Sequence, residues 1–157
     1  MISGWYQSIS QRWVRLCLIC LIAFCSLAKT HAQPFIDFLM LERLKKNNGE
    51  EAFTRGQQLN ALLLELKNKD AQIQLLEVNR FFNRFKHTSD QQVWGESDYW
   101  ATPEEFIGEH RGDCEDYVIA KYFTLRYLGI SDNHLYLTYV KALKQNVRHI
   151  VFTNLVQ

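Results

Sequence analysis

The sequence has few cysteines, and only one of them lies outside an apolar stretch near the N-terminus. Of the four, Cys17, Cys20 and Cys25 fall in that stretch, and Cys114 stands alone in the rest of the chain. If the stretch is removed on export, Cys114 has no second cysteine to pair with, and a structural disulfide within the mature chain is excluded. Two interpretations of Cys114 remain open, a reactive thiol and an inert buried one.

Runs of basic residues interleaved with aromatic residues are also absent, which argues against a nucleic-acid-binding protein. Removing residues 1–32 takes away Arg12, Arg15 and Lys29, so that 15 basic side chains face 17 acidic ones and the formal charge falls from +1 to −2. The remaining residues 33–157 are enough for one small domain with a packed core.

The longest apolar run, residues 16–28, is too short to span a bilayer comfortably, because a spanning helix needs about 20 apolar residues. Arg12 and Arg15 precede the run, and the small residues Thr30 and Ala32 follow it. This order is typical of a Sec-type signal peptide cleaved after Ala32, and it predicts that the rest of the chain leaves the cytoplasm. Phe24 is too large for a lipobox before Cys25, so a lipoprotein is not expected. An uncleaved anchor is the alternative interpretation.

Three helices are expected in the first half of the mature chain. Apolar residues recur at helical spacing within residues 35–46, 50–68 and 70–85, and Asn47, Asn48 and Gly49 separate the first two segments. Alternating apolar and charged faces predict that these helices pack together beneath any functional site. Residues 87–102 read as a polar loop that contains Trp94, Tyr99 and Trp100.

The next two helices have clear starting signals. Thr102, Pro103 and Glu105 have the spacing of a capping box with proline at the first helical position, which predicts a short helix ending near His110. Gly112 then interrupts the chain, and a longer helix is expected from about Cys114 to residue 128 before Gly129.

The C-terminal part of the sequence has β character. Residues 135–140 and 147–156 are rich in β-branched and aromatic residues, and residues 141–146 have the length of a hairpin connection. A two-stranded hairpin is marginally stable on its own, so this sheet is expected to be incomplete. The predicted class is therefore α+β, with N-terminal helices and the helix at Cys114 packed on an antiparallel sheet.

Cys114 and His149 are the residues best suited to nucleophilic catalysis. A thiolate is favoured at a helix N-terminus, where the backbone N–H of Cys114 could also bind an oxyanion. His149, on the second predicted strand, could act as the base of a thiol–imidazole pair. An ordinary strand histidine is the alternative for His149. Asp113 and Glu115 oppose a thiolate unless a nearby positive charge neutralises them.

The motifs around Cys114 resemble those of the bacterial transglutaminase-like cysteine proteinases, and within that family the periplasmic LapG-type proteases. The resemblance is carried by W-A-T-P-E-E at residues 100–105, by R-G-D-C-E-D-Y at residues 111–117 and by R-H-I-V at residues 148–151. It implies a papain/transglutaminase-like fold with Cys114 as the nucleophile and His149 as the base of a cysteine endopeptidase.

The same resemblance implies a calcium site in which Asp113, Glu115 and Asp116 supply carboxylates. Ca²⁺ prefers such oxygen ligands and would neutralise the acids beside the nucleophile. Acids that merely complement the helix dipole are the alternative. The substrate implied is a large surface adhesin, cleaved near its N-terminus at a pair of alanines to release cells from a biofilm. The regulator implied is an inner-membrane receptor for cyclic di-GMP.

The sequence departs from the family in one respect. The family completes its catalytic triad with an aspartate on the strand after the histidine, whereas only eight residues follow His149, and none of them is acidic. The domain at residues 33–157 is therefore expected to be truncated at its C-terminus. A catalytically inactive remnant that acts at most as a binding module, and a papain-like amidase, are the alternatives to an active protease.

Overall fold

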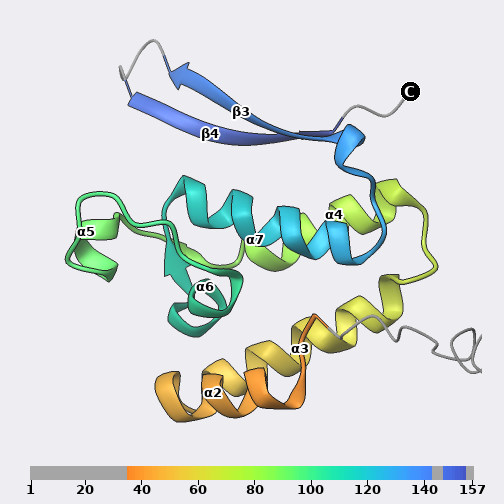
Figure 1. Ribbon diagram of the computed structural model, residues 1–157, viewed down its shortest axis with the longest axis horizontal. Helices are drawn as coiled ribbons and strands as arrows, with labels where there is room; N and C mark the ends of the chain where they lie inside the picture. The colour runs from red at the N-terminus through yellow and green to blue at the C-terminus, as the bar shows by residue number, and fades with distance from the viewer. Residues whose placement is uncertain (1–34, 143–146, 155–157) are drawn as a thin grey trace, which may run out of the picture. The chain divides into compact units, whose positions relative to one another are not determined.

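The computed structural model describes residues 35–142 and 147–154 of the chain. The predicted signal peptide, residues 1–32, lies outside this described part. The described elements are, in chain order, α2 (Phe38–Asn48), α3 (Glu50–Leu66), α4 (Ala71–Phe82), β1 (Lys86–His87), α5 (Asp90–Val93), α6 (Pro103–Glu109), β2 (Arg111–Gly112), α7 (Cys114–Tyr127), the 3-10 turn η1 (Asp132–His134), β3 (Leu135–Ala142) and β4 (Val147–Asn154) (Figure 1).

Helices α2 and α3 form an antiparallel pair joined by one glycine. Asp37 caps α2 by accepting a hydrogen bond from the backbone N–H of Met40 at 2.6 Å. Gly49 then ends α2 at φ 87°, a left-handed value that glycine adopts without strain, and its N–H donates to the carbonyl of Lys45. Because the connection is so short, the two helices pack along their length and provide one side of the core.

An aromatic cluster joins α4, α6 and α7. The ring of Phe106 on α6 lies 6.0 Å from that of Phe82 and 4.9 Å from that of Phe85, both measured between centroids. Tyr117 on α7 packs on the same ring at 4.8 Å, and its hydroxyl donates to the carbonyl of Phe85 at 2.6 Å. Phe82 and Phe106 are completely buried. This cluster therefore fixes the position of α6 against the helix that begins at Cys114.

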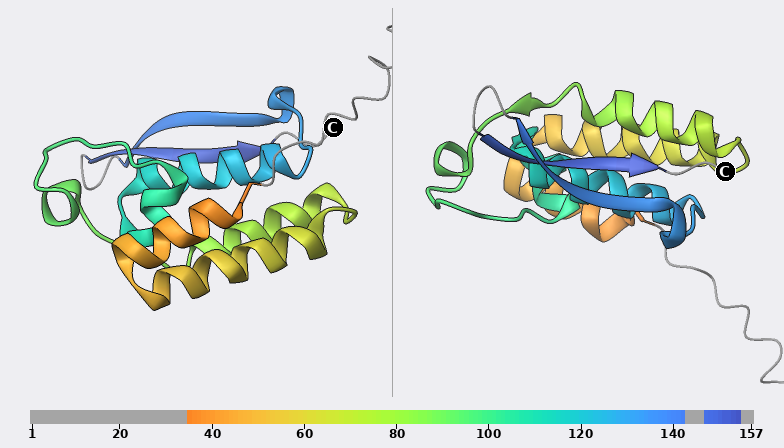
Figure 2. Two further views of the ribbon diagram at one scale, coloured as in Figure 1. Left: turned by 60° about the horizontal axis from the view of Figure 1, so that its bottom comes forward. Right: turned by 90° about the horizontal axis from the view of Figure 1, so that it is seen from above.

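Two small sheets accompany the helices. Strands β3 and β4 form the expected antiparallel hairpin, with Leu135 opposite Asn154 and Ala142 opposite Val147. Strand β4 lies against α7, and the two run side by side in the same direction (Figures 1 and 2). A second, parallel pair joins β1 to β2, with Lys86 opposite Arg111. No local pattern in the sequence predicts this second pair.

The expected helices and hairpin are confirmed, with small differences at their ends. Helix α2 begins at Phe38 rather than residue 35, since the Asp37 cap sets its start. Helix α4 ends at Phe82, and Asp70 precedes it without a side-chain capping bond. The expected polar loop contains the short helix α5. Among the helices of the described residues, none has the length and apolar character needed to cross a membrane.

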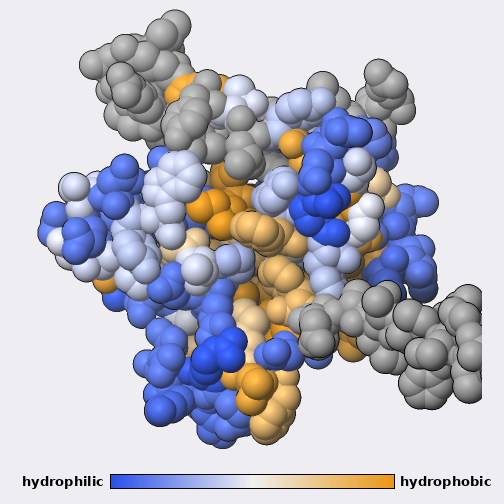
Figure 3. Space-filling view, viewed as in Figure 1, coloured by the Kyte–Doolittle hydropathy of each residue, from blue (hydrophilic) through white to orange (hydrophobic). Residues whose placement is uncertain are grey.

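Helix α7 is buried on one face and partly exposed on another. Val118, Ala120 and Leu125 are buried, whereas Phe123 and Tyr127 are about half exposed. Apolar colour accordingly gathers along the middle of the molecule in Figure 3, over α7, while α5 and the loop beside it are largely hydrophilic. The helix that begins at Cys114 is thus the central element between the helical layer and the β3–β4 hairpin.

Candidate active site and carboxylate cluster

The start of α7 is fixed by a capping box. Asp113 is the N-cap, and its side chain accepts from the N–H of Glu115 at 3.1 Å. The carboxylate of Asp116 reaches back to accept from the N–H of Asp113 at 3.2 Å. These reciprocal bonds satisfy N–H groups that a helix start leaves without partners. Cys114 is therefore the first residue of the helix, as its sequence context predicts.

The thiol of Cys114 is partly buried and faces an acid. Its Sγ donates a hydrogen bond to Oε2 of Glu115 at 2.8 Å. A carboxylate at this distance favours the protonated thiol over the thiolate, because a second negative charge beside it would be repelled. The dipole of α7 acts in the opposite direction. The reactivity of Cys114 therefore depends on the charge of the acids around it.

Asp113 has a strongly perturbed acidity. The pKa of its carboxyl group is raised to about 7, first by burial, then by a hydrogen bond to Glu115 and by the negative charges of Glu115, Asp90 and Asp116. Burial also raises the pKa of Asp116, against the lowering effect of the backbone N–H groups that donate to it. Such acids, close together and shielded from water, are costly to ionise without a compensating cation.

Asp90 belongs to this group of acids and is not signalled by the sequence. It lies on α5, far upstream of Asp113, and its side chain is buried. One carboxylate oxygen accepts from the N–H of Tyr99 at 2.8 Å, and the other has no hydrogen-bond partner among the described residues. Asp90, Asp113 and Asp116 each place a carboxylate oxygen within 4.8 Å of the others. We call these three residues the carboxylate cluster.

The carboxylate cluster fits a hard divalent cation. Within the part of the chain that the structure describes, none of its members forms an ion pair with a lysine, arginine or histidine. The buried oxygen of Asp90 without a donor is the kind of atom that a metal ion satisfies. Asp113, Cys114 and Glu115 also lie within 4.8 Å of one another, but a thiol is a poor ligand for Ca²⁺. Oxygen-only coordination therefore favours the carboxylate cluster.

Of the predicted metal ligands, the structure places Asp113 and Asp116 in the carboxylate cluster. Glu115 lies beside the cluster, hydrogen-bonded to Asp113 and to the thiol of Cys114. Asp90 is a third member of the carboxylate cluster that only the fold reveals. No local pattern in the sequence could have indicated it, because the approach of α5 to the start of α7 depends on the pairing of β1 with β2.

The carboxylate cluster also holds the aromatic loop in place. Asp90 accepts from the N–H of Tyr99, and Asp116, which is completely buried, accepts from the N–H of Ala101 at 2.8 Å. The loop continues into α6, where Thr102 and Glu105 form the predicted capping box. The segment that precedes α6 is thereby tied to the acids at the start of α7.

His149 lies on β4, and only its backbone is within the described part of the structure. It is the third residue of this strand and is paired with Val140. Helix α7 and strand β4 begin at the same end of the pair that they form (Figures 1 and 2). The backbone of His149 thus belongs to the element packed against α7, near the end at which Cys114 stands.

A helix that begins at a cysteine and packs beside a strand of an antiparallel hairpin that carries a histidine is typical of a class of protein, the papain-type cysteine proteinases with a transglutaminase-like fold. The family to which this chain belongs follows from a match to a family model. The family model described as "Bacterial transglutaminase-like cysteine proteinase BTLCP" matches residues 45–157. The chain belongs to this family.

Solved structures support the same assignment. "Legionella pneumophila LapG" is 36% identical over 78% of this chain and 67% of its own, with a TM-score of 0.65. The calcium-bound form is 37% identical over 73% of this chain and 65% of its own, with a TM-score of 0.61. The EGTA-treated form is 36% identical over 78% of this chain and 66% of its own, with a TM-score of 0.65. This chain thus spans about two thirds of those proteins. Among curated proteins none matches.

Proposed function

We propose that this protein is a calcium-dependent cysteine protease of the periplasm that cleaves a large surface adhesin near its N-terminus and so controls biofilm release. The observation that carries the proposal is the position of Cys114 at the start of α7, beside a cluster of buried and half-buried carboxylates, in a chain that belongs to a cysteine proteinase family. The substrate, the location and the biofilm role rest on the likeness to LapG-type proteases.

Cys114 and His149 would share the covalent chemistry. The thiol transfers its proton to the imidazole, and the sulfur attacks the carbonyl carbon of the scissile peptide bond. The backbone N–H of Cys114 stabilises the oxyanion. When the tetrahedral intermediate collapses, the C–N bond breaks, the imidazolium protonates the leaving amine, and a thioester remains on Cys114. Water, deprotonated by the imidazole, then hydrolyses the thioester and regenerates the thiol.

Asp90, Asp113 and Asp116 would hold the calcium ion, with Glu115 next to them. The calcium-bound structure of LapG supports a site of this kind in a relative. A bound cation would supply the positive charge that the acids around Cys114 need before a thiolate can form beside them. The orphan oxygen of Asp90 and the absence of basic partners among the described neighbours of the cluster support this assignment.

Two partners follow from the proposal. The substrate is an adhesin with an alanine pair near its N-terminal anchor, and the regulator is an inner-membrane receptor that responds to cyclic di-GMP. Both would meet the enzyme in the periplasm, after a Sec-type signal peptide at residues 1–32 has been removed.

The test of catalysis is cleavage of an alanine-pair adhesin peptide by the purified protein in calcium. We expect cleavage by the unmodified protein, complete loss in Cys114→Ala and His149→Ala, and loss in EGTA that returns when calcium is restored. An unmodified protein that binds the peptide without cleaving it would favour the inactive binding module. Cleavage that persists in Cys114→Ala would exclude this residue as the nucleophile.

The test of the metal site is calorimetry with Ca²⁺ on variants that preserve shape. Asp90→Asn removes one charge from the carboxylate cluster and should weaken calcium binding at least tenfold. Asp98→Asn is the matched control, because Asp98 lies in the loop that follows α5, is exposed and accepts a hydrogen bond from the indole N–H of Trp100 rather than joining the carboxylate cluster. In the cleavage assay, Asp113→Ala should abolish the dependence of activity on calcium. Unchanged calcium binding in both cluster variants would place the metal elsewhere.

A further inference from the structure

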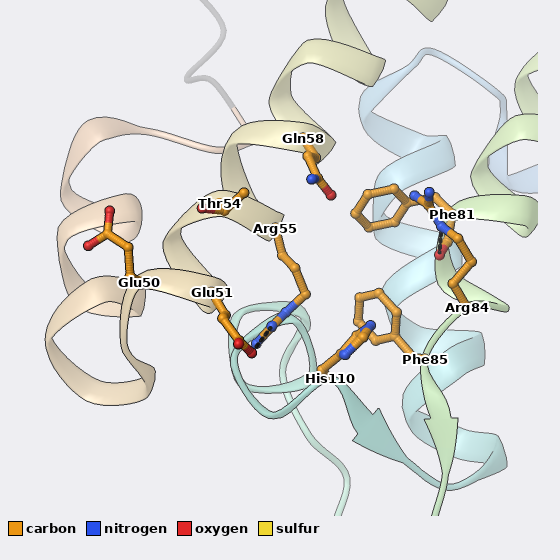
Figure 4. A pocket seen from close by; sticks show the side chains of 9 residues that line it. All are labelled: Glu50, Glu51, Thr54, Arg55, Gln58, Phe81, Arg84, Phe85 and His110. Carbon is orange, nitrogen blue, oxygen red and sulfur yellow. Dashed lines mark hydrogen bonds and ion pairs between the residues drawn. The ribbon is translucent and has the colours of Figure 1, made fainter.

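A pocket of about 460 Å³ opens between α3, α4 and the end of α6, away from the carboxylate cluster. Its volume falls within the range of small-molecule sites, roughly 300–1,000 Å³. In Figure 4 the rings of Phe81 and Phe85 lie in the middle of the pocket, facing Arg55 and Gln58 of α3. None of the residues proposed for catalysis or calcium binding lines it.

The floor of the pocket is aromatic. The ring centroids of Phe81 and Phe85 are 5.7 Å apart and tilted by 55°. The imidazole of His110 stands edge-on to Phe85, with 4.5 Å between centroids. His110 holds this place because it ends α6 in a left-handed conformation, at φ 57°. The three rings offer a flat or aliphatic group a surface to pack on.

Two arginines line the pocket, and they differ in what they already bind. Arg55 donates to the carbonyls of Ile107 and Gly108, at 2.9 and 2.6 Å, and so caps the end of α6. Arg84 lies over the ring of Phe81 at 5.0 Å, and only its Nε makes a hydrogen bond, a long one to the carbonyl of Phe81 at 3.4 Å. Its two terminal nitrogens find no acceptor among the described residues. Arg84 therefore offers a ligand a charged donor.

The acidic residues at the rim of the pocket do not neutralise the positive charge of Arg84. Glu50 is paired with Lys45 at 3.0 Å, and Glu51 faces Arg55 at 4.0 Å. The pKa of His110 is lowered, by burial first and then by the positive charges of Arg55 and Arg84. The two arginines thus make the electrostatic potential at the pocket floor more positive, which favours a negatively charged group there.

We propose that this pocket binds a small ligand that carries a carboxylate on an aromatic or branched apolar body. The carboxylate pairs with the terminal nitrogens of Arg84, since a guanidinium fork matches a carboxylate in shape and charge. The apolar body packs on Phe81 and Phe85, and His110 lies within the lining to meet a polar substituent. Both a free acid and the C-terminal residue of a peptide have this chemistry.

The test is an NMR titration of the full chain with three probes, followed through the ring signals of His110. The probes are 3-phenylpropionate, its neutral analogue 3-phenylpropanamide, and N-acetylphenylalanine as a mimic of a peptide C-terminus. We expect saturable shifts at His110 with the acids and weaker binding of the amide by tenfold or more, because it lacks the charge that Arg84 pairs with. Binding of N-acetylphenylalanine alone would identify a peptide terminus, and binding of both acids a free carboxylate.

Two variants make the assignment specific. Arg84→Gln should weaken the acids at least tenfold and leave the amide unchanged. Arg80→Gln is the matched control, since Arg80 is exposed on α4 shortly before Arg84, is paired with Glu77 at 2.7 Å and does not line this pocket. Circular dichroism verifies the fold of each. The proposal is overturned if the acids produce no saturable shift at His110, if the amide binds as tightly as the acids, or if both variants bind alike.

Discussion

Gly112→Ala is expected to dismantle the start of α7, although it adds a single methyl group. A Cβ at this position would lie 2.2 Å from Oδ2 of Asp116 and 2.9 Å from Cε2 of Phe106. Gly112 does not have a positive φ, so its backbone could accept alanine. The penalty of the substitution therefore comes from the atoms that occupy the space, and both belong to completely buried side chains.

The loss of stability expected for Gly112→Ala can be estimated from the hydrogen bonds that Asp116 would lose. Its carboxylate accepts hydrogen bonds from the N–H groups of Ala101 and Asp113, at 2.8 and 3.2 Å, and moving it breaks at least one of them. A hydrogen bond to a charged group contributes about 1.5–3 kcal/mol, and overpacking a core costs about 1–3 kcal/mol. The sum, about 2.5–6 kcal/mol, is a large part of the roughly 5–15 kcal/mol that stabilises a typical domain.

Urea unfolding followed by circular dichroism in EGTA measures this cost without a contribution from calcium. Gly95→Ala is the control, because Gly95 has open space around its Cβ position and a φ of 75°, so alanine there should cost only about 1–2 kcal/mol of backbone strain. If Gly112→Ala were no more destabilising than Gly95→Ala, the close packing of Gly112 on Asp116 would be refuted, and with it the rigid capping box.

Three further outcomes are expected. In EGTA, folded Asp113 keeps its proton between pH 3.8, its ordinary pKa, and about 7, whereas the unfolded chain loses it, so the free energy of unfolding should fall as pH rises through this window. Asp113→Asn should flatten this dependence on pH in urea titrations, and a free energy of unfolding that rises with pH would contradict the raised pKa. Thr102→Ala removes the acceptor for the N–H of Glu105 and should cost about 1 kcal/mol in thermal or urea unfolding, while Thr102→Ser should cost little. Tyr117→Phe leaves the carbonyl of Phe85 without its 2.6 Å donor and should cost about 1–3 kcal/mol in the same assay; a neutral result would mean that water replaces the hydroxyl.

The sequence predicts those parts of the fold that local signals determine. The capping box at Thr102 and Glu105 and the helix start after Gly112 were both expected, because a cap involves residues that are close in sequence. The β3–β4 hairpin was expected for the same reason, since its strands are adjacent in the chain. The motif around Cys114 predicted the family, which the match to residues 45–157 confirms.

The features that the sequence could not predict depend on contacts between distant segments. The pair of β1 and β2 is only two residues long on each side, too short for a periodic pattern to reveal it. Asp90 is not predictable from the sequence because its burial and its approach to Asp113 depend on contacts between segments that are far apart in the chain. The roles of the predicted catalytic and metal residues remain predictions, and the side chain of His149 lies outside the described part of the structure.

The sequence left two interpretations of the acids beside Cys114, complements to the helix dipole or ligands of calcium, and the geometry shows that one residue can do both. Asp113 caps α7 by accepting at Oδ1 from the N–H of Glu115, and the same carboxylate contributes an oxygen to the carboxylate cluster. Asp116 likewise holds two backbone N–H groups while its charge remains uncompensated by any described basic residue. Because the same acids cap the helix and form the cluster, a cation bound there would act directly on the first turn of α7, where Cys114 stands.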